Sequence, residues 1–302
     1  MVAPAGAKSV GRLFKHINAC RGKMIRPALL LLAGAACGKI TDKHIRVAAI
    51  VEMMHDATLL HDDVIDEGQK RRGLPTVNSL WGNESAVLLG DFLLSRVFKM
   101  CADLEPHLAR IIADTASRTC QGELRQISLR NHGWRVDEAE YIDIITEKSA
   151  VFFSNCCYLG GLLAGAGRVQ LRSMTDFGRN VGIAFQIADD LLDITGDENK
   201  TGKTTGSDAD KKKLTLSVIH LLKTIDGIRK DAVKRRLNAS GGKSKDALAK
   251  MLSRSGSLRY AAERAQEFVC KAIESLAALK ESDAKNALIE TARFAADRVV
   301  IL

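Results

Sequence analysis

Proline is scarce in this sequence, which favours helices. Only four prolines occur among 302 residues and none follows Pro106, so nearly two-thirds of the chain lacks the strongest helix breaker. Alternating strand patterns bounded by turn residues are rare as well, which disfavours a β-rich fold. No linker rich in proline, glycine and serine divides the chain, so we expect residues 1–302 to form a single domain.

Paired cysteines and an N-terminal apolar stretch are also missing. The seven cysteines include no CxxC pair, and Cys156 and Cys157 are adjacent, so neither a zinc site nor a disulfide framework is indicated. Reduced thiols are typical of the cytoplasm, where we expect the protein. Residues 1–16 contain no apolar run, so we expect no signal peptide.

One uncharged segment is long enough to resemble a membrane span. It runs from Ser149 to Gly167, "SAVFFSNCCYLGGLLAGAG", and its apolar character is diluted by Ser, Asn, Tyr and four glycines. We therefore favour a buried core helix, because a helix that is apolar all round is expected at the centre of a large helical protein.

Apolar residues recur with helical spacing in several long segments, and turn-rich stretches separate them. The hydrophobic fraction of 46% fits a globular chain, and the pattern predicts an all-α fold. The expected helices cover Ile45–Asp66, Glu84–Leu104, Ala109–Leu129, Val136–Gly165, Met174–Thr195 and Leu214–Thr224.

Two aspartate clusters with the spacing DDxxD stand out within these segments. The first comprises Asp62, Asp63 and Asp66, and the second comprises Asp189, Asp190 and Asp193. On a helix the residues i and i+4 share one face, where like charges repel, so a cation should offset the repulsion. Mg²⁺ is the natural candidate, because it is commonly held by one or two carboxylates together with substrate phosphates.

Basic residues follow both clusters. Arg71 and Arg72 can grip phosphate oxygens, and Lys203 adds a positive charge from a glycine-rich stretch. The net charge of 45 − 36 = +9 also suits an anionic partner. Acidic runs on helices are usually solvated surfaces, but both clusters here are embedded in apolar sequence. The physics therefore favours a site for metal ions and a diphosphate, which becomes a good leaving group when metal ions stabilise its charge.

The sequence resembles the trans-type isoprenyl diphosphate synthases over nearly its whole length. The motifs that carry the resemblance are "GKMIRP" (Gly22–Pro27), "LLHDDVIDEGQKRRGLPT", "GIAFQIADDLLDITGD" and "TGKTTGSDADKKKLTL", in that order. Met24 stands where the family usually has a second basic residue. The resemblance implies an all-α bundle with a deep central cavity, usually as a homodimer. It also implies Mg²⁺-dependent, head-to-tail condensation of isopentenyl diphosphate with an allylic diphosphate, with three ions when diphosphate is bound.

The resemblance also implies roles for individual residues. Isopentenyl diphosphate would be bound by Lys23, Arg26, His55 and Arg72. The metal ions would be held by Asp62, Asp66 and Asp189, with Asp63, Asp190 and Asp193 completing the two motifs. The allylic diphosphate would be contacted by Arg71, Lys148 and Lys203, with Lys213 of the "KLTL" sequence beside them. Gln186 and the hydroxyl of Ser149 would lie near the developing carbocation. Asp62, Asp66, Asp189, Lys148 and Gln186 would carry the catalysis.

Other functions remain open from the sequence alone. A class I terpene cyclase would share the fold, but it normally carries a second metal motif of the Asn/Ser/Glu type. A non-catalytic subunit of a heteromeric synthase would tend to lose one motif, and both are intact here. A basic helical module for nucleic acid would explain the charge, but the acidic clusters would repel phosphates, so we expect no nucleic-acid partner. A peripheral membrane contact during product release is also open.

Product length is expected to depend on the residues beneath the first motif. Thr58 and Ala57 lie four and five residues before Asp62, and both are small, whereas short-chain members of the family often have aromatic residues there. Met54 lies one further turn below, and Phe152 and Phe153 are expected on the opposite wall. We therefore expect a long-chain product, with a farnesyl or geranylgeranyl diphosphate synthase as the alternative.

Overall fold

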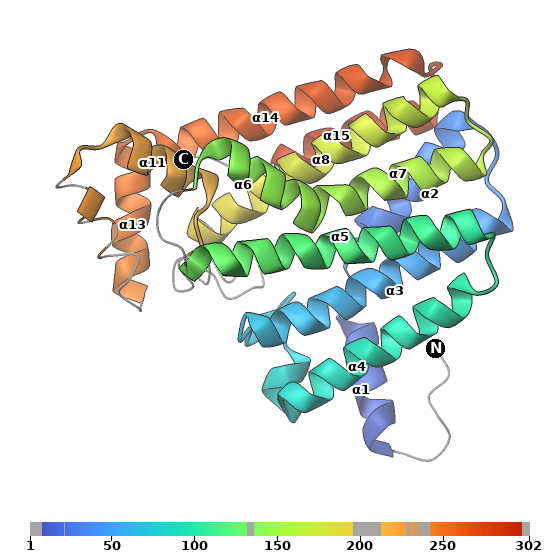
Figure 1. Ribbon diagram of the computed structural model, residues 1–302, viewed down its shortest axis with the longest axis horizontal. Helices are drawn as coiled ribbons and strands as arrows, with labels where there is room; N and C mark the ends of the chain where they lie inside the picture. Colours follow the sequence, from blue (N-terminus) through green and yellow to red (C-terminus); the bar gives the residue numbers. More distant parts are fainter. Residues whose placement is uncertain are drawn as a thin grey trace.

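The computed structural model describes residues 8–20, 22–131, 136–195, 213–227, 230–231, 233, 235 and 242–297. Helices dominate this part of the chain, which confirms the predicted all-α class (Figure 1). The elements are α1 (Lys8–Ala19), α2 (Ile25–Cys37), α3 (Asp42–Ile65), β1 (Lys70–Arg71), β2 (Leu74–Pro75), α4 (Val77–Cys101), α5 (Pro106–Asn131), α6 (Glu138–Ile145), η1 (Thr146–Ala150), α7 (Val151–Leu163), α8 (Arg168–Thr195), α11 (Leu216–Thr224), α13 (Gly242–Arg254), α14 (Ser257–Ser275), η2 (Leu276–Ala278) and α15 (Asp283–Asp297).

Helix α7 lies at the centre of the bundle (Figure 1). It packs along α2 and along α8, while α14 covers α8 and α15 contacts α2 and α8. Nine of the thirteen residues of α7 are buried, including Phe153, Cys156 and Cys157, and the other four are half-buried. The uncharged segment is thus a core helix, as predicted. Within the described residues, no helix combines the length and apolarity that crossing a membrane requires.

Both aspartate motifs lie at the C-terminal ends of their helices. Helix α3 begins after Thr41, whose hydroxyl and backbone N–H both pair with the His44 ring in a capping box, and it ends at Ile65 with Asp66 as its C-cap. The second motif occupies the last two turns of α8. Negative charge is unfavourable at a helix C-terminus, and neither helix has a basic residue in its last turn. The helices alone would therefore disfavour these acids, which indicates that the aspartates serve a function other than helix stability.

One predicted helix is interrupted. The segment expected to be continuous over Val136–Gly165 forms α6, a π-helical turn η1 and then α7. The π-helical turn packs on α5 at Gly122, where a Cβ atom would come within 2.3 Å of the backbone nitrogen of Lys148. Only glycine permits this approach. Such turns inside helices are frequent at functional sites, and this one carries Lys148 and Ser149.

A short hairpin between α3 and α4, which we had not predicted, carries the two arginines. Strands β1 and β2 are antiparallel, with Lys70 opposite Pro75 and Arg71 opposite Leu74. Their two-residue loop, Arg72–Gly73, has φ of 54° and 78°, as in a type I′ turn. Arg71 therefore lies in the strand whereas Arg72 lies in the turn, and the two side chains meet different partners.

Candidate active site

In the first motif, Asp63 faces the interior of the protein. Its buried carboxylate accepts hydrogen bonds from Arg71, with Nε at 2.9 and 3.0 Å from the two oxygens and Nη2 at 2.7 Å. This is a charge-assisted, forked contact of the strong kind. Asp62 and Asp66 lie on another face of the helix end, one turn apart.

The second motif repeats this arrangement. Asp190 is buried, and its carboxylate accepts hydrogen bonds from the Tyr141 hydroxyl at 2.7 Å, Gln186 Nε2 at 2.9 Å and Lys213 Nζ at 3.0 Å. The i, i+4 pair in this motif is Asp189 and Asp193. In both motifs, therefore, the second aspartate binds a basic side chain from the segment that follows it.

The two motifs act on the same guanidinium group. Burial alone would lower the pKa of Arg71, but its hydrogen bond and charge interaction with Asp63 raise it, and Asp62 and Asp189 add to the rise. Asp62 on α3 and Asp189 on α8 are therefore both near the guanidinium of Arg71. The structure thus brings the two motifs and Arg71 together, as the sequence predicts.

Asp62 faces an environment that disfavours its charge. Burial raises the pKa of Asp62 to about 6; Lys148 and Arg71 oppose this shift, while Glu123 and Asp66 increase it. Lys148 forms an ion pair with Glu123 and donates a hydrogen bond of 2.8 Å to Gln126 Oε1. Sequence reasoning missed Glu123 and Gln126, which come from α5 and fix the position of the predicted Lys148.

Ser149 and Gln186 connect the π-helical turn to the second motif. The Ser149 hydroxyl donates a 2.6 Å hydrogen bond to Gln186 Oε1, and the amide nitrogen of Gln186 donates to Asp190. A chain of hydrogen bonds therefore runs from η1 to Asp190, and on to Tyr141 and Lys213. The position of Lys148 in η1 is thereby coupled to the second motif.

Arg26 and His55 form a second group of predicted residues, between α2 and α3. Arg26 Nη1 donates to His55 Nε2 at 2.9 Å, so this ring nitrogen accepts. The guanidinium also lies over the rings of Phe152 and Phe153, 4.9 and 4.6 Å from their centroids. Burial lowers the pKa of Arg26, and nearby Cys156, Glu52 and Asp62 partly offset this.

Arg72 lies near Arg26, and Lys23 precedes Arg26 by three residues. Arg72 Nη1 donates to the backbone oxygen of Cys20 at 2.5 Å, and its guanidinium packs so closely on Gly22 that a Cβ atom there would clash at 2.3 Å. The ammonium of Lys23 lies 4.4 Å from the ring centroid of Phe294. The predicted Lys203 lies outside the described residues.

Backbone strain is concentrated in this region. Among the described residues other than glycine, positive φ angles occur at Met24 (52°), Glu67 (48°) and Arg72 (54°). Each adjoins residues predicted to bind substrate or metal. Such conformations cost roughly 1–3 kcal/mol each and cluster at functional sites, where the surrounding structure enforces them.

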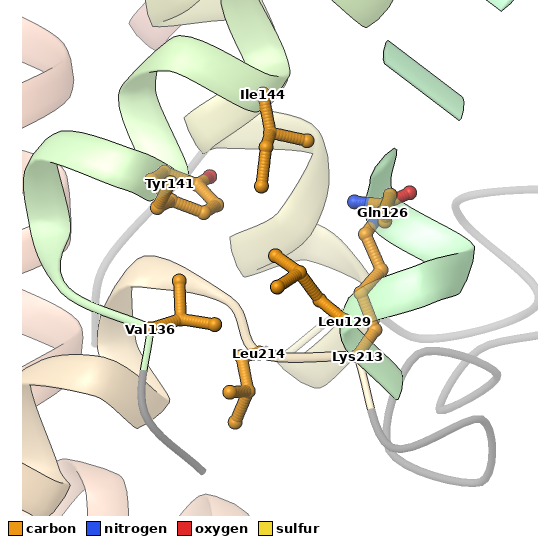
Figure 2. Close-up of a pocket in the computed structure, with 7 residues that line it drawn as sticks. All are labelled: Gln126, Leu129, Val136, Tyr141, Ile144, Lys213 and Leu214. Carbon is orange, nitrogen blue, oxygen red and sulfur yellow. The ribbon is translucent and has the colours of Figure 1, made fainter. Parts of the chain in front are cut away.

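A small pocket adjoins the second motif. Figure 2 shows apolar side chains from α5, α6 and the segment before α11 converging beside Tyr141, with Gln126 and Lys213 at its edge. Its lining residues are Gln126, Leu129, Val136, Tyr141, Ile144, Lys213 and Leu214. The Tyr141–Asp190–Lys213 contacts are therefore bordered by apolar surface.

The residues beneath the first motif point in different directions. Ala57, about 140° around the helix from Asp62, is fully buried among Phe14, Leu89 and Leu93 of α1 and α4. The structure thus gives the small side chain of Ala57 a role in helix packing, and we expect Thr58 rather than Ala57 to face the product tunnel. Thr58 is half-buried and only about 40° from Asp62. Met54 is buried against Phe152, Cys156 and Leu159.

Comparisons with known proteins assign the chain to a family. The sequence profile described as polyprenyl synthetase matches residues 7–254. The chain belongs to the polyprenyl synthetase family. It is 37% identical over 289 residues to an all-trans-nonaprenyl-diphosphate synthase (geranyl-diphosphate specific) of Rhodobacter capsulatus, covering 94% of this chain and 88% of that protein. It is also 31% identical to a geranylgeranyl diphosphate synthase of Methanosarcina mazei, covering 92% of this chain and 86% of that protein.

A solved structure agrees with this membership. The polyprenyl synthase of Caulobacter crescentus, crystallised with calcium and isoprenyl diphosphate, superposes with a TM-score of 0.91 at 31% identity, covering 97% of this chain and 90% of that one. The family confirms that the chain is a prenyltransferase, which condenses diphosphates head to tail into a trans-polyprenyl diphosphate. Its relatives make products of different lengths.

Proposed function

We propose that this polyprenyl synthetase uses Mg²⁺ to join isopentenyl diphosphate to an allylic diphosphate and that its product is long. The observation that carries the metal requirement is the pair of aspartates at each of two helix C-termini, where the charges repel each other and oppose the helix dipole. Bound metal cations would offset both the repulsion between the paired carboxylates and their unfavourable interaction with the helix dipole.

Asp62 and Asp66 on α3, with Asp189 and Asp193 on α8, are the residues that fit the metal ions. Within the described residues, no three Asp, Glu, His or Cys side chains gather closely enough to enclose an ion. A pair of carboxylates nevertheless suits Mg²⁺, which completes its coordination with phosphate oxygens and water. Bound Mg²⁺ would supply charge stabilisation to the departing diphosphate. Because Asp63 and Asp190 accept hydrogen bonds from Arg71 and Lys213, we propose that these two carboxylates hold the basic side chains in place and do not bind metal ions.

The basic residues divide into two groups around the metal site. Arg71, Lys148 and Lys213 surround the aspartates, so they would bind the diphosphate that leaves, together with Lys203. Ser149 and Gln186 would face the carbocation. On the other side, isopentenyl diphosphate would be bound by Lys23, Arg26, His55 and Arg72. The contact of Arg26 with His55 and with the rings of Phe152 and Phe153 supports this second group.

An exposed apolar face supports a homodimer. On α4, Val87, Leu88 and Phe98 are exposed beyond the kink at Gly82, with Leu88 and Phe98 more than two-thirds exposed. Leu80 before the kink and Leu124 of α5 are exposed as well. Apolar patches of this kind mark interaction surfaces. We infer that a second copy of the chain covers α4 and α5.

We also infer the cellular compartment of the enzyme and its contact with membranes. Seven free cysteines suit the reducing cytoplasm, where we place the reaction. A long polyprenyl chain favours a peripheral membrane contact during product release. The contacts of α14 and α15 with α8 support a single catalytic domain that includes the residues beyond 254.

Incubation of the purified protein with isopentenyl diphosphate and a short allylic diphosphate should yield extended prenyl diphosphates only when Mg²⁺ is present. Chromatography of the dephosphorylated products measures both activity and chain length. Inorganic diphosphate should raise the melting temperature in the presence of Mg²⁺ but not with EDTA. Stabilisation by DNA without metal, or product formation in EDTA, would overturn the proposal.

Arg71→Ala and Arg72→Ala should affect different substrates. Arg71 binds Asp63 at the metal site, whereas Arg72 points toward Cys20 and Gly22, near Arg26. We expect the Arg71 variant mainly to raise KM for the allylic diphosphate and the Arg72 variant mainly to raise KM for isopentenyl diphosphate, each about tenfold or more. Steady-state kinetics with each substrate varied in turn measures the split. Equal effects of both variants on both constants would contradict the assignment.

A further inference from the structure

Tyr141 lies in α6, outside both aspartate motifs, and its hydroxyl reaches one of them. The side chain is 2% exposed, and its hydroxyl donates a 2.7 Å hydrogen bond to Oδ2 of Asp190, which is itself 3% exposed. Gln186 and Lys213 both donate to the other oxygen, Oδ1. Tyr141 therefore supplies a donor to the second oxygen of this carboxylate, Oδ2.

Helix α6 is fixed well enough to act as a support. Its N-cap residue, Asp137, accepts a hydrogen bond from the backbone N–H of Glu140 at 2.9 Å. Glu138 is held from α14 by the Tyr260 hydroxyl at 2.5 Å and by Arg264 Nε at 2.8 Å. One turn of helix separates this clamp from Tyr141. The clamp therefore holds the helix that carries Tyr141 against α14.

The surroundings of the contact make the hydroxyl hard to replace. Figure 2 shows the Tyr141 ring beside Val136, Ile144 and Leu214. A buried carboxylate oxygen that loses a donor is penalised by its desolvation, more than a neutral group would be. Without the hydroxyl, the Asp190 carboxylate would be stabilised by turning toward other donors. Lys213 and the Gln186–Ser149 chain, which share this carboxylate, would turn with it.

We propose that Tyr141 is a positioning residue of the active site, holding Asp190 so that Lys213 stays aimed at the leaving diphosphate and Gln186 at the carbocation while Asp189 and Asp193 face the metal ions. Tyr141 does not touch substrate. It acts through Asp190, and this role rests on the proposed function of the second motif.

Tyr141→Phe tests the role because it removes only the hydroxyl. We expect kcat/KM for the allylic diphosphate to fall about 10- to 100-fold, as for loss of a hydrogen bond to a buried charge. The Mg²⁺ concentration for half-maximal activity should rise. Calorimetric titration of inorganic diphosphate in Mg²⁺ should show weaker binding by a similar factor. Unchanged diphosphate binding and unchanged Mg²⁺ dependence would overturn the proposal.

Two matched variants separate positioning from stability. Tyr260→Phe removes a hydroxyl that supports the same helix through Glu138, and Tyr158→Phe removes one elsewhere in the core helix α7. Tyr260→Phe should lower the melting temperature while leaving the Mg²⁺ dependence unchanged, and Tyr158→Phe should leave the Mg²⁺ dependence unchanged as well. If Tyr260→Phe shifts the Mg²⁺ dependence as much as Tyr141→Phe, the effect is one of general stability and the role is refuted.

A double-mutant cycle asks whether Tyr141 acts through Asp190. If it does, Tyr141→Phe combined with Asp190→Asn should be no less active than Asp190→Asn alone, because the shared pathway is already broken. If the activity losses of the two single variants multiply in the double variant, Tyr141 does not act through Asp190. The wild-type titration separates failure of the proposed function from failure of the role of Tyr141. If the wild type shows no Mg²⁺-dependent diphosphate binding, the proposed function itself is refuted. If the wild type and Tyr141→Phe both bind diphosphate normally, only the role of Tyr141 is refuted.

Discussion

Asp62→Asn should abolish most turnover and at the same time stabilise the metal-free protein. The amide has nearly the size of the carboxylate, but it carries no charge with which to hold Mg²⁺. We expect kcat to fall at least 100-fold, corresponding to about 2.7 kcal/mol of lost transition-state stabilisation. The gain in stability follows from the raised pKa of Asp62.

The gain in stability depends on pH. The pKa of Asp62 rises from 3.8 to about 6 on folding, mainly through burial. Between these values the folded protein binds more protons than the unfolded chain, so stability falls as pH rises through this window and stays lower above it. A shift of this size sets an upper limit of about 3 kcal/mol at pH 8. Urea unfolding in EDTA should show the Asn variant to be more stable at pH 8, with little difference at pH 4.

Two further variants serve as controls. Asp189→Asn should lose activity to a similar extent, because its carboxylate belongs to the opposite pair. Asp176→Asn lies on the same helix, α8, but its carboxylate is half-exposed and pairs with Arg172, so activity should be retained. Circular dichroism would report whether each variant keeps its helices. Retention of more than a tenth of the activity by Asp62→Asn and Asp189→Asn would rule out the metal-binding role.

Local periodicity was sufficient to predict the framework of the site. Apolar residues at helical spacing predicted the course of α3, α5 and α8, and the i, i+4 spacing predicted that Asp62 pairs with Asp66 and Asp189 with Asp193. The charge-free sequence predicted the buried α7. These features depend on near neighbours in the chain, which sequence patterns report directly.

The interruption at η1 depends on a distant contact. The segment from Val136 reads as one helix, because nothing within it breaks the apolar period. The π-helical turn accompanies the close approach of α5, which Gly122 permits. The glycine was visible in the sequence, but its partner was not, so the support of Lys148 by Glu123 and Gln126 was missed as well.

The different roles of the aspartates within each motif could not be predicted from the sequence either. Asp63 is about 100° around the helix from Asp62, so it must face elsewhere, but the spacing does not say toward what. The partners are Arg71, eight residues later in a type I′ hairpin, and for Asp190 the distant Tyr141 and Lys213. Tertiary structure alone distinguishes a carboxylate that anchors a cation from one that faces the substrate.

Thr58→Phe should shorten the product. Thr58 lies one helical turn, about 5.4 Å, beneath Asp62 and on nearly the same face, so a prenyl chain growing away from the metal ions passes it first. Its hydroxyl makes a local hydrogen bond of 2.8 Å to the His55 carbonyl, and losing this bond should cost little stability. For the wild type we propose a product of roughly six to ten isoprene units, because the small side chain of Thr58 leaves the first turn below the motif open. The phenyl ring should shift the products toward farnesyl or geranylgeranyl length while condensation continues.

Ala57→Phe is the matched control, since it adds the same ring one residue earlier. Ala57 packs against α1 and α4, so the ring would overpack that core and destabilise the fold by about 1–3 kcal/mol rather than block the tunnel. The two variants should therefore differ in kind: shorter products with near-normal unfolding for Thr58→Phe, and wild-type products with lower stability for Ala57→Phe. Chromatography of the products and urea unfolding measure the two effects. If Ala57→Phe alone shortens the chain, the floor of the tunnel lies on the α4 side of α3. If the wild type already stops at farnesyl diphosphate, the tunnel is not open below Thr58 and another residue forms its floor.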